Sequence, residues 1–115
     1  GRDGYRRMIA DDCALARELH ALAGAHEELE ALTYSLSIAT FRYVPKGPAR
    51  SADELNALNT AILARLQAEG RVYVSNAVIG GTFALRACVV NFRTDSADVH
   101  ALVDAVVVAG RQLSS

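Results

Sequence analysis

An arginine lies in the middle of an apolar segment, residues 80–92, that reads GGTFALRACVVNF. Side chains alternate between the two faces of a strand, so Arg86 shares its face with Ala84 and Cys88. A buried guanidinium without a partner costs several kcal/mol, which means that Arg86 must reach water, a structural partner or an anion. Guanidinium geometry favours bidentate pairing with a carboxylate. Arg86 is therefore either an anion-binding residue or a structural arginine, and its position leaves both readings open.

The other side chains with reactive chemistry do not form a recognisable catalytic motif. Lys46, the only lysine, lies in the predicted turn 46–50, where no neighbour lowers the pKa of its amine as a Schiff-base nucleophile requires. Gly80 and Gly81 join two predicted strands instead of leading from a strand into a helix, so they do not form a phosphate-binding loop. Arg42 lies near the end of its strand, where we expect its side chain to reach solvent. The histidines and carboxylates lack the spacing of a nucleophilic, acid–base or metal site.

Composition narrows the class of protein. The 115 residues suit one domain with a modest core. The formal net charge is −1 and no basic cluster contains aromatic side chains, so we expect no nucleic-acid partner. No apolar run approaches the roughly 20 residues that span a bilayer, so we expect no membrane partner. Cys13 and Cys88 are predicted to be reduced core residues of a cytoplasmic protein. The chain begins with GRDG instead of methionine, and we expect it to be a piece of a longer polypeptide.

Hydrophobic periodicity predicts seven elements in the order α-β-β-α-β-β-α. Helices are predicted at 4–23, 52–69 and from 95 or 96 to 113, and strands at 29–34, 36–44, 71–78 and 82–90. The strand over 36–44 is apolar on both faces, which is typical of a central strand. Ser51 and Glu54 form a capping box, and either Asp95 or Ser96 caps the last helix. The segment 79–81 is predicted to be a tight hairpin turn. The pattern predicts an α+β two-layer sandwich, a mostly antiparallel sheet with helices packed on it.

Three segments, in this order of elements, resemble one enzyme family. They are FRYVP at 41–45, LNALNTAILARLQAEGRVY at 55–73 and ALRACVVNFRT at 84–94. Together they are similar to the C-terminal domain of the group II pyridoxal-phosphate (PLP)-dependent amino-acid decarboxylases. That family includes the aromatic-L-amino-acid, tyrosine, glutamate and 2,4-diaminobutyrate decarboxylases. The resemblance extends over nearly the whole chain, from about Asp3 to about Leu113.

The resemblance implies the arrangement of fold-type I PLP enzymes, in which a large domain holds PLP on a lysine and a small C-terminal domain closes one side of the active site. Residues 1–115 would be that single small domain, and the large PLP-binding domain would lie outside this chain. By this resemblance, Arg86 matches a strand arginine that holds the substrate's α-carboxylate in relatives. Arg86 is therefore the predicted substrate-binding residue. No catalytic, cofactor-binding or metal-binding residue is expected in this chain.

The intact parent is thus predicted to be a PLP-dependent amino-acid decarboxylase, and the piece alone is predicted to be inactive and to bind no cofactor. Its expected partners are the amino-acid substrate, the large domain of the same polypeptide and a second subunit in a cytoplasmic homodimer. An α+β sandwich of this size is also compatible with a free-standing ligand-binding or oligomerisation module. Fold alone does not separate these readings.

Overall fold

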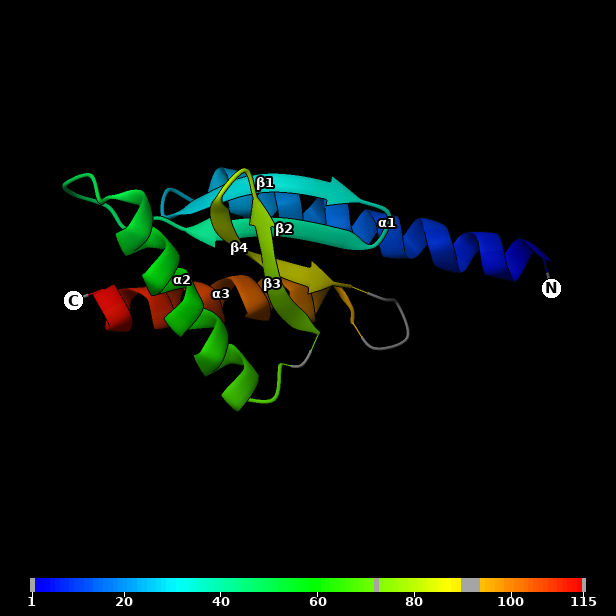
Figure 1. Ribbon diagram of the computed structural model, residues 1–115. Helices are drawn as coiled ribbons and strands as arrows, with labels where there is room; N and C mark the ends of the chain where they lie inside the picture. The colour runs from blue at the N-terminus through cyan, green and yellow to red at the C-terminus, as the bar shows by residue number, and fades with distance from the viewer. Residues whose placement is uncertain (1, 72, 90–93, 115) are drawn as a thin grey trace.

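The computed structural model describes residues 2–71, 73–89 and 94–114, and it describes the side chains of the first helix from Asp12 onward. Figure 1 shows its elements, which are α1 (Arg2–Ala25), β1 (Leu29–Ser35), β2 (Ile38–Tyr43), α2 (Ala52–Ala68), β3 (Val74–Ile79), β4 (Thr82–Cys88) and α3 (Ser96–Ser114). The predicted order of elements is confirmed. The positions of Val72 and Val90, which fall in the predicted strands 71–78 and 82–90, lie outside the described residues.

The four strands form one antiparallel sheet in the order β1-β2-β4-β3. In this sheet β2 is an inner strand, as its apolar faces predict, and Phe41 lies opposite Ala31 of β1 and opposite Leu85 of β4. The buried strand residues that join the core share one face of the sheet by this register; they are Leu29, Ala39, Phe41, Tyr43, Val74, Leu85 and Ala87. All three helices contribute to the same core, with residues that include Leu19, Ile62, Leu66, Leu102 and Val106. The predicted two-layer α+β sandwich is confirmed.

The helices therefore cover one face of the sheet, and none of the described helices covers the other. We call this second side the uncovered face; it carries Ile38, Thr40, Arg42, Ser75, Ala84, Arg86 and Cys88. The N-terminal half of α1 extends past the sheet in Figure 1, so that the two termini lie at opposite ends of a molecule of 52 × 27 × 21 Å. No helix in the described part of the chain is long and apolar enough to span a membrane.

Several predicted boundaries are wrong: β3 begins at Val74 and not at Arg71, and β4 ends at Cys88, before Val89. Two further differences lie at hairpin turns. Leu36 is predicted to begin the strand 36–44, but it lies in the turn before β2, with a φ of 53° and 72% of its surface exposed. Its sequence gives no turn signal, because leucine rarely adopts left-handed backbone. Ile79 is predicted to lie in the turn 79–81, but it pairs with Thr82 as the last residue of β3. The turn itself contains only Gly80 and Gly81, whose φ angles of 58° and 83° suit a two-residue hairpin.

Short polar side chains begin α2 and α3. Ser51 Oγ accepts a hydrogen bond from the Glu54 N–H at 3.1 Å, as predicted, but the Glu54 carboxylate accepts from the Ser51 hydroxyl and not from its backbone N–H. A capping box with two reciprocal backbone-to-side-chain hydrogen bonds occurs at the start of α3 instead. There the Asp98 N–H donates to Asp95 Oδ1 at 2.9 Å, and the Asp95 N–H donates to Asp98 Oδ2 at 3.1 Å. Asp95, and not Ser96, is therefore the cap of α3.

Candidate functional site

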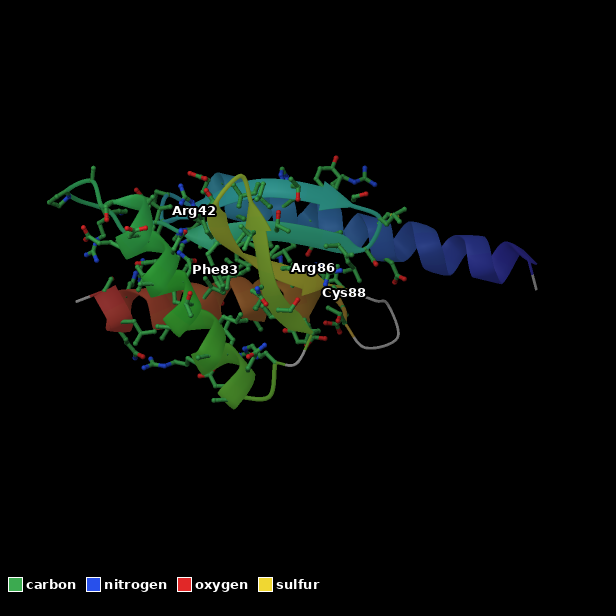
Figure 2. The ribbon with its side chains drawn as sticks, viewed as in Figure 1. Arg42, Phe83, Arg86 and Cys88 are labelled. Atoms are coloured by element: carbon green, nitrogen blue, oxygen red, sulfur yellow. The ribbon has the colours of Figure 1, made fainter. Side chains whose placement is uncertain are left out.

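A row of polar side chains crosses all four strands on the uncovered face. The register places Thr33 of β1 opposite Thr40 of β2, Thr40 opposite Arg86 of β4, and Arg86 opposite Ser75 of β3. Arg86 is half-buried in this row, flanked on both sides by hydroxyl-bearing residues. Figure 2 shows Arg86 beside Cys88 on β4, whereas Arg42 lies toward the other end of the sheet. The uncovered face thus presents one arginine near its centre.

Arg86 has no carboxylate partner among the described residues. Its Nη1 donates one hydrogen bond, to Ser75 Oγ at 3.5 Å, which is longer than a typical N–H···O bond. Thr40 is already engaged with Thr33: their hydroxyl oxygens are 2.6 Å apart, and the Thr33 N–H donates to Thr40 Oγ1 at 3.0 Å. A guanidinium has five N–H donors, and only one of those of Arg86 has a partner among the described residues. The other donors and the positive charge are available to a ligand.

Arg42, on the same face, is a structural arginine that pairs with a carboxylate of the neighbouring strand. Its Nε and Nη2 donate to the two carboxylate oxygens of Glu30 at 3.1 and 3.4 Å, and the two residues are direct cross-strand neighbours. The side chain of Arg42, predicted to reach solvent, is 17% exposed, and it pairs at the surface with a Glu30 side chain that is 46% exposed. A carboxylate directly opposite on the adjacent strand holds the guanidinium down on the sheet.

The remaining candidate residues do not join Arg86. Lys46 pairs with Glu27 through Nζ and Oε1 at 2.7 Å, in a loop where 54% of the lysine side chain is exposed. Cys13 and Cys88 are free thiols, but the prediction that they are core residues is wrong, because both are only half-buried and neither belongs to the core. The residues that the structure describes contain no group of three or more His, Cys, Asp or Glu that would hold a metal ion.

The described residues also do not fit a PLP site. The only lysine of the sequence is the Lys46 that pairs with Glu27, and the two-glycine turn joins β3 to β4 with no helix N-terminus behind it to receive a phosphate.

The end of β2 is held by an asparagine of α2. The pairing of β2 with β4 ends at Phe41 and Leu85, which leaves the backbone of Tyr43 without a strand partner on that side. The fully buried Asn59 takes the partner's place: its Oδ1 accepts from the Tyr43 N–H at 2.8 Å, and its Nδ2 donates to the Tyr43 carbonyl at 3.0 Å. Asn59 Nδ2 also donates to the carbonyl of Leu55 at 2.9 Å, which fixes the amide on its own helix.

A second asparagine, one turn earlier on α2, holds the β3–β4 hairpin. Asn56 Oδ1 accepts from the Phe83 N–H at 2.9 Å, and Asn56 Nδ2 donates to the Gly81 carbonyl at 3.3 Å. Phe83 lies close to α2 in Figure 2, at the end of β4 remote from Cys88. These two amides fix the central strands, and with them the row that contains Arg86. Our interpretation of the sequence missed both residues, although two amides three positions apart among the leucines of a buried helix face were a usable signal.

An ion pair between the buried Glu28 carboxylate and the mostly exposed Arg111 side chain attaches the C-terminal turn of α3 to the residue before β1. The Glu28 carboxylate, only 5% exposed as a residue, accepts from Arg111 Nη2 at 2.6 Å, from Arg111 Nε at 3.1 Å and from the Tyr43 hydroxyl at 2.8 Å. Hydrogen bonds from Arg111 and Tyr43 hold the pKa of Glu28 below its usual value, although burial opposes them. Burial and the adjacent Glu28 carboxylate raise the pKa of Tyr43. Gly110 lies under the Tyr43 ring, where a Cβ would come within 2.6 Å of the ring carbons.

Pockets on the described surface include two that Arg86 does not line. A groove of about 360 Å³ lies between α2 and α3, with Arg65, Arg71 and Val108 among its lining residues. A hollow of about 230 Å³ lies beside Cys13 and Leu36. Arg86 lines neither of these two pockets.

The chain is similar to amino-acid decarboxylases in sequence and in fold. No protein-family model matches the sequence. A tyrosine decarboxylase of Petroselinum crispum is 29% identical over 99 residues, which are 84% of this chain and 20% of that protein. The fold of Oryza sativa TDC with PLP matches with a TM-score of 0.88 at 20% identity, over 100% of this chain and 25% of the other. Catharanthus roseus tryptophan decarboxylase in complex with L-tryptophan matches with a TM-score of 0.77 at 23% identity, over 93% of this chain and 22% of the other.

The predicted resemblance to the group II PLP-dependent decarboxylases is therefore confirmed, in sequence by the tyrosine decarboxylases and in fold by decarboxylase structures. The chain spans about a fifth of the length of the curated relatives that it matches and up to a quarter of the structural ones. These relatives thus carry most of their residues outside the matched part.

Proposed function

We propose that this chain is the C-terminal small domain of a PLP-dependent amino-acid decarboxylase and that Arg86 binds the α-carboxylate of the substrate. The observation that carries the proposal is the state of Arg86, a half-buried guanidinium on the uncovered face whose one partner among the described residues is a neutral serine. A structural arginine on this face has a carboxylate partner, as Arg42 has in Glu30. A half-buried guanidinium without a counter-ion keeps its charge and most of its N–H donors available to an anion, which favours the anion-binding reading.

The uncovered face supports the second part of the proposal, that the active site is completed by other parts of the enzyme. No described helix covers the face that carries the half-buried Arg86, so we expect its ligand to be enclosed when another surface covers the sheet. In the proposal, the large domain of the same polypeptide covers this face and holds PLP. A second subunit completes a homodimer in the cytoplasm, where the free thiols of Cys13 and Cys88 stay reduced.

The chemical role of Arg86 in this proposal is to orient the bond that breaks. Two parallel hydrogen bonds from a guanidinium fix the direction of a carboxylate and therefore of its bond to Cα. The grip must remain moderate, because an interaction that stabilises the charged ground state more than the transition state slows the loss of CO2. The isolated chain is expected to release no CO2, since its one lysine is exposed and paired with Glu27.

The test uses the complete reading frame that contains this chain. We expect its product to release CO2 from an L-amino acid, with L-tyrosine, L-tryptophan, L-glutamate and L-2,4-diaminobutyrate as the first candidates, whereas the chain mixed with PLP releases none. Arg86→Ala should raise KM about 10- to 100-fold, as expected for the loss of hydrogen bonds to a charged group. Arg42→Ala is the matched control and should leave KM within about twofold, because Arg42 already pairs with Glu30.

Two results would contradict the proposal. One is a complete frame that releases no CO2 from any of these amino acids or has an Arg86→Ala variant with unchanged KM. The other is an isolated chain that binds a free carboxylate ligand and loses it on Arg86→Ala, which would favour a free-standing binding module.

A further inference from the structure

The contact between Arg86 and Ser75 selects one edge of the guanidinium. Ser75 Oγ accepts from Nη1 at 3.5 Å, and the two residues are direct cross-strand neighbours on β4 and β3. A carboxylate can grip a guanidinium in bidentate fashion along the Nε–Nη2 edge or along the Nη1–Nη2 edge. Because Ser75 accepts from one of the two N–H groups of Nη1, the Nε–Nη2 edge is the one whose N–H groups all lack protein partners among the described residues.

The same face contains an example of that edge holding a carboxylate. Arg42 uses Nε and Nη2 to grip the two oxygens of Glu30. Arg86 is the equivalent arginine without a cross-strand acid, since its direct neighbours are Thr40 on β2 and Ser75 on β3. The Thr40 hydroxyl instead contacts the Thr33 hydroxyl at 2.6 Å and accepts from the Thr33 N–H at 3.0 Å.

We infer that Ser75 is a positioning residue that orients the Arg86 guanidinium without neutralising it, so that the Nε–Nη2 edge meets the substrate's α-carboxylate. The inference rests on the proposed function of Arg86 and deepens it. A neutral hydroxyl suits this role because an acidic residue at position 75 would form an internal ion pair, as Glu30 does with Arg42, and would compete with the substrate. An alanine at the same position would leave the guanidinium free to rotate away from the productive orientation.

The experiment compares Ser75→Ala, Ser75→Thr and Ser75→Asp in the complete enzyme, with Ser35→Ala as the control. Ser35 is an exposed serine of the same sheet, on edge strand β1, opposite Ile38. Three quantities are measured for each variant: KM for the amino acid, kcat, and the inhibition constant of the corresponding amine. The amine lacks the carboxylate, so a residue that acts through the carboxylate contact should not change its inhibition constant.

Ser75→Ala should raise KM about three- to tenfold with the amine inhibition constant unchanged, because a weak, long hydrogen bond is lost. Ser75→Thr keeps the hydroxyl and should restore KM to within about twofold, whereas Ser75→Asp should raise it at least about tenfold. The Ser35→Ala control should leave all three quantities unchanged.

An unchanged KM in Ser75→Ala, beside a raised KM in Arg86→Ala, would overturn the positioning role and leave the function of Arg86 intact. Parallel changes in KM and in the amine inhibition constant would also overturn it, since they would indicate a general disturbance of the sheet. An Arg86→Ala variant with unchanged KM would instead reject the proposed function itself, and the role of Ser75 with it.

Discussion

Replacing Asn59 by alanine should destabilise the chain more than any other asparagine-to-alanine change in the elements described here. Asn59 is fully buried and makes both hydrogen bonds to the backbone of Tyr43. Its removal leaves the Tyr43 N–H and carbonyl without these partners inside the core. A buried polar group left unsatisfied costs about 1–3 kcal/mol, so two of them predict a loss of about 3–4 kcal/mol in the free energy of unfolding. That is a large fraction of the roughly 5–15 kcal/mol that stabilises a typical domain.

Urea denaturation followed by circular dichroism measures this loss of stability. Alanine variants of two other asparagines serve as comparisons, with smaller expected losses. Asn56→Ala removes two bonds at a half-buried site and should cost about 1–2 kcal/mol. Asn76→Ala, at an exposed position of β3, should change stability by less than about 0.5 kcal/mol. The reasoning is refuted if Asn59→Ala and Asn76→Ala unfold at the same urea concentration, because the amide of Asn59 would then not replace a strand partner.

Two further predictions concern the attachment of α3. Folding lowers the pKa of Glu28 from its ordinary value of 4.5, so the charged carboxylate stabilises the fold above about that pH, and this stability is lost as pH falls through the folded pKa. The urea midpoint of Glu28→Gln should therefore decline less than that of the unchanged chain between about pH 5 and 3. An equal decline would contradict the role of the ion pair. Gly110→Ala should lower stability by about 2–3 kcal/mol despite its higher helix propensity, because the new Cβ would lie 2.6 Å from the buried Tyr43 ring. Gly24→Ala, whose Cβ would make an ordinary 3.7 Å contact, should not lower the melting temperature, and equal losses in the two variants would argue against the clash.

The architecture could be predicted from the sequence because its signals are local. Leucines at helical spacing on α2, alternation in β4 and a pair of glycines each act within a few residues, and they were enough to order the elements. The turn at Leu36 could not be predicted, because its conformation is fixed by the pairing of β1 with β2 and not by a turn residue.

The candidate site, too, could be predicted from the sequence only where its features are local. Alternation in the strand put Arg86 on the same face as Ala84 and Cys88, and the register confirms this placement. Its cross-strand neighbours Thr40 and Ser75 come from strands far apart in sequence, so their contact with Arg86 depends on register. For the same reason the cross-strand pairing of Arg42 with Glu30 was missed, and solvent exposure was predicted in its place.

The most direct measurement of the central claim is a crystal structure of the complete enzyme with an unreactive amino-acid analogue bound. We predict that the analogue's carboxylate oxygens lie within about 3 Å of Arg86 Nε and Nη2 while Ser75 Oγ remains on Nη1. A carboxylate held by other residues, with Arg86 contacting only the protein, would contradict the claim.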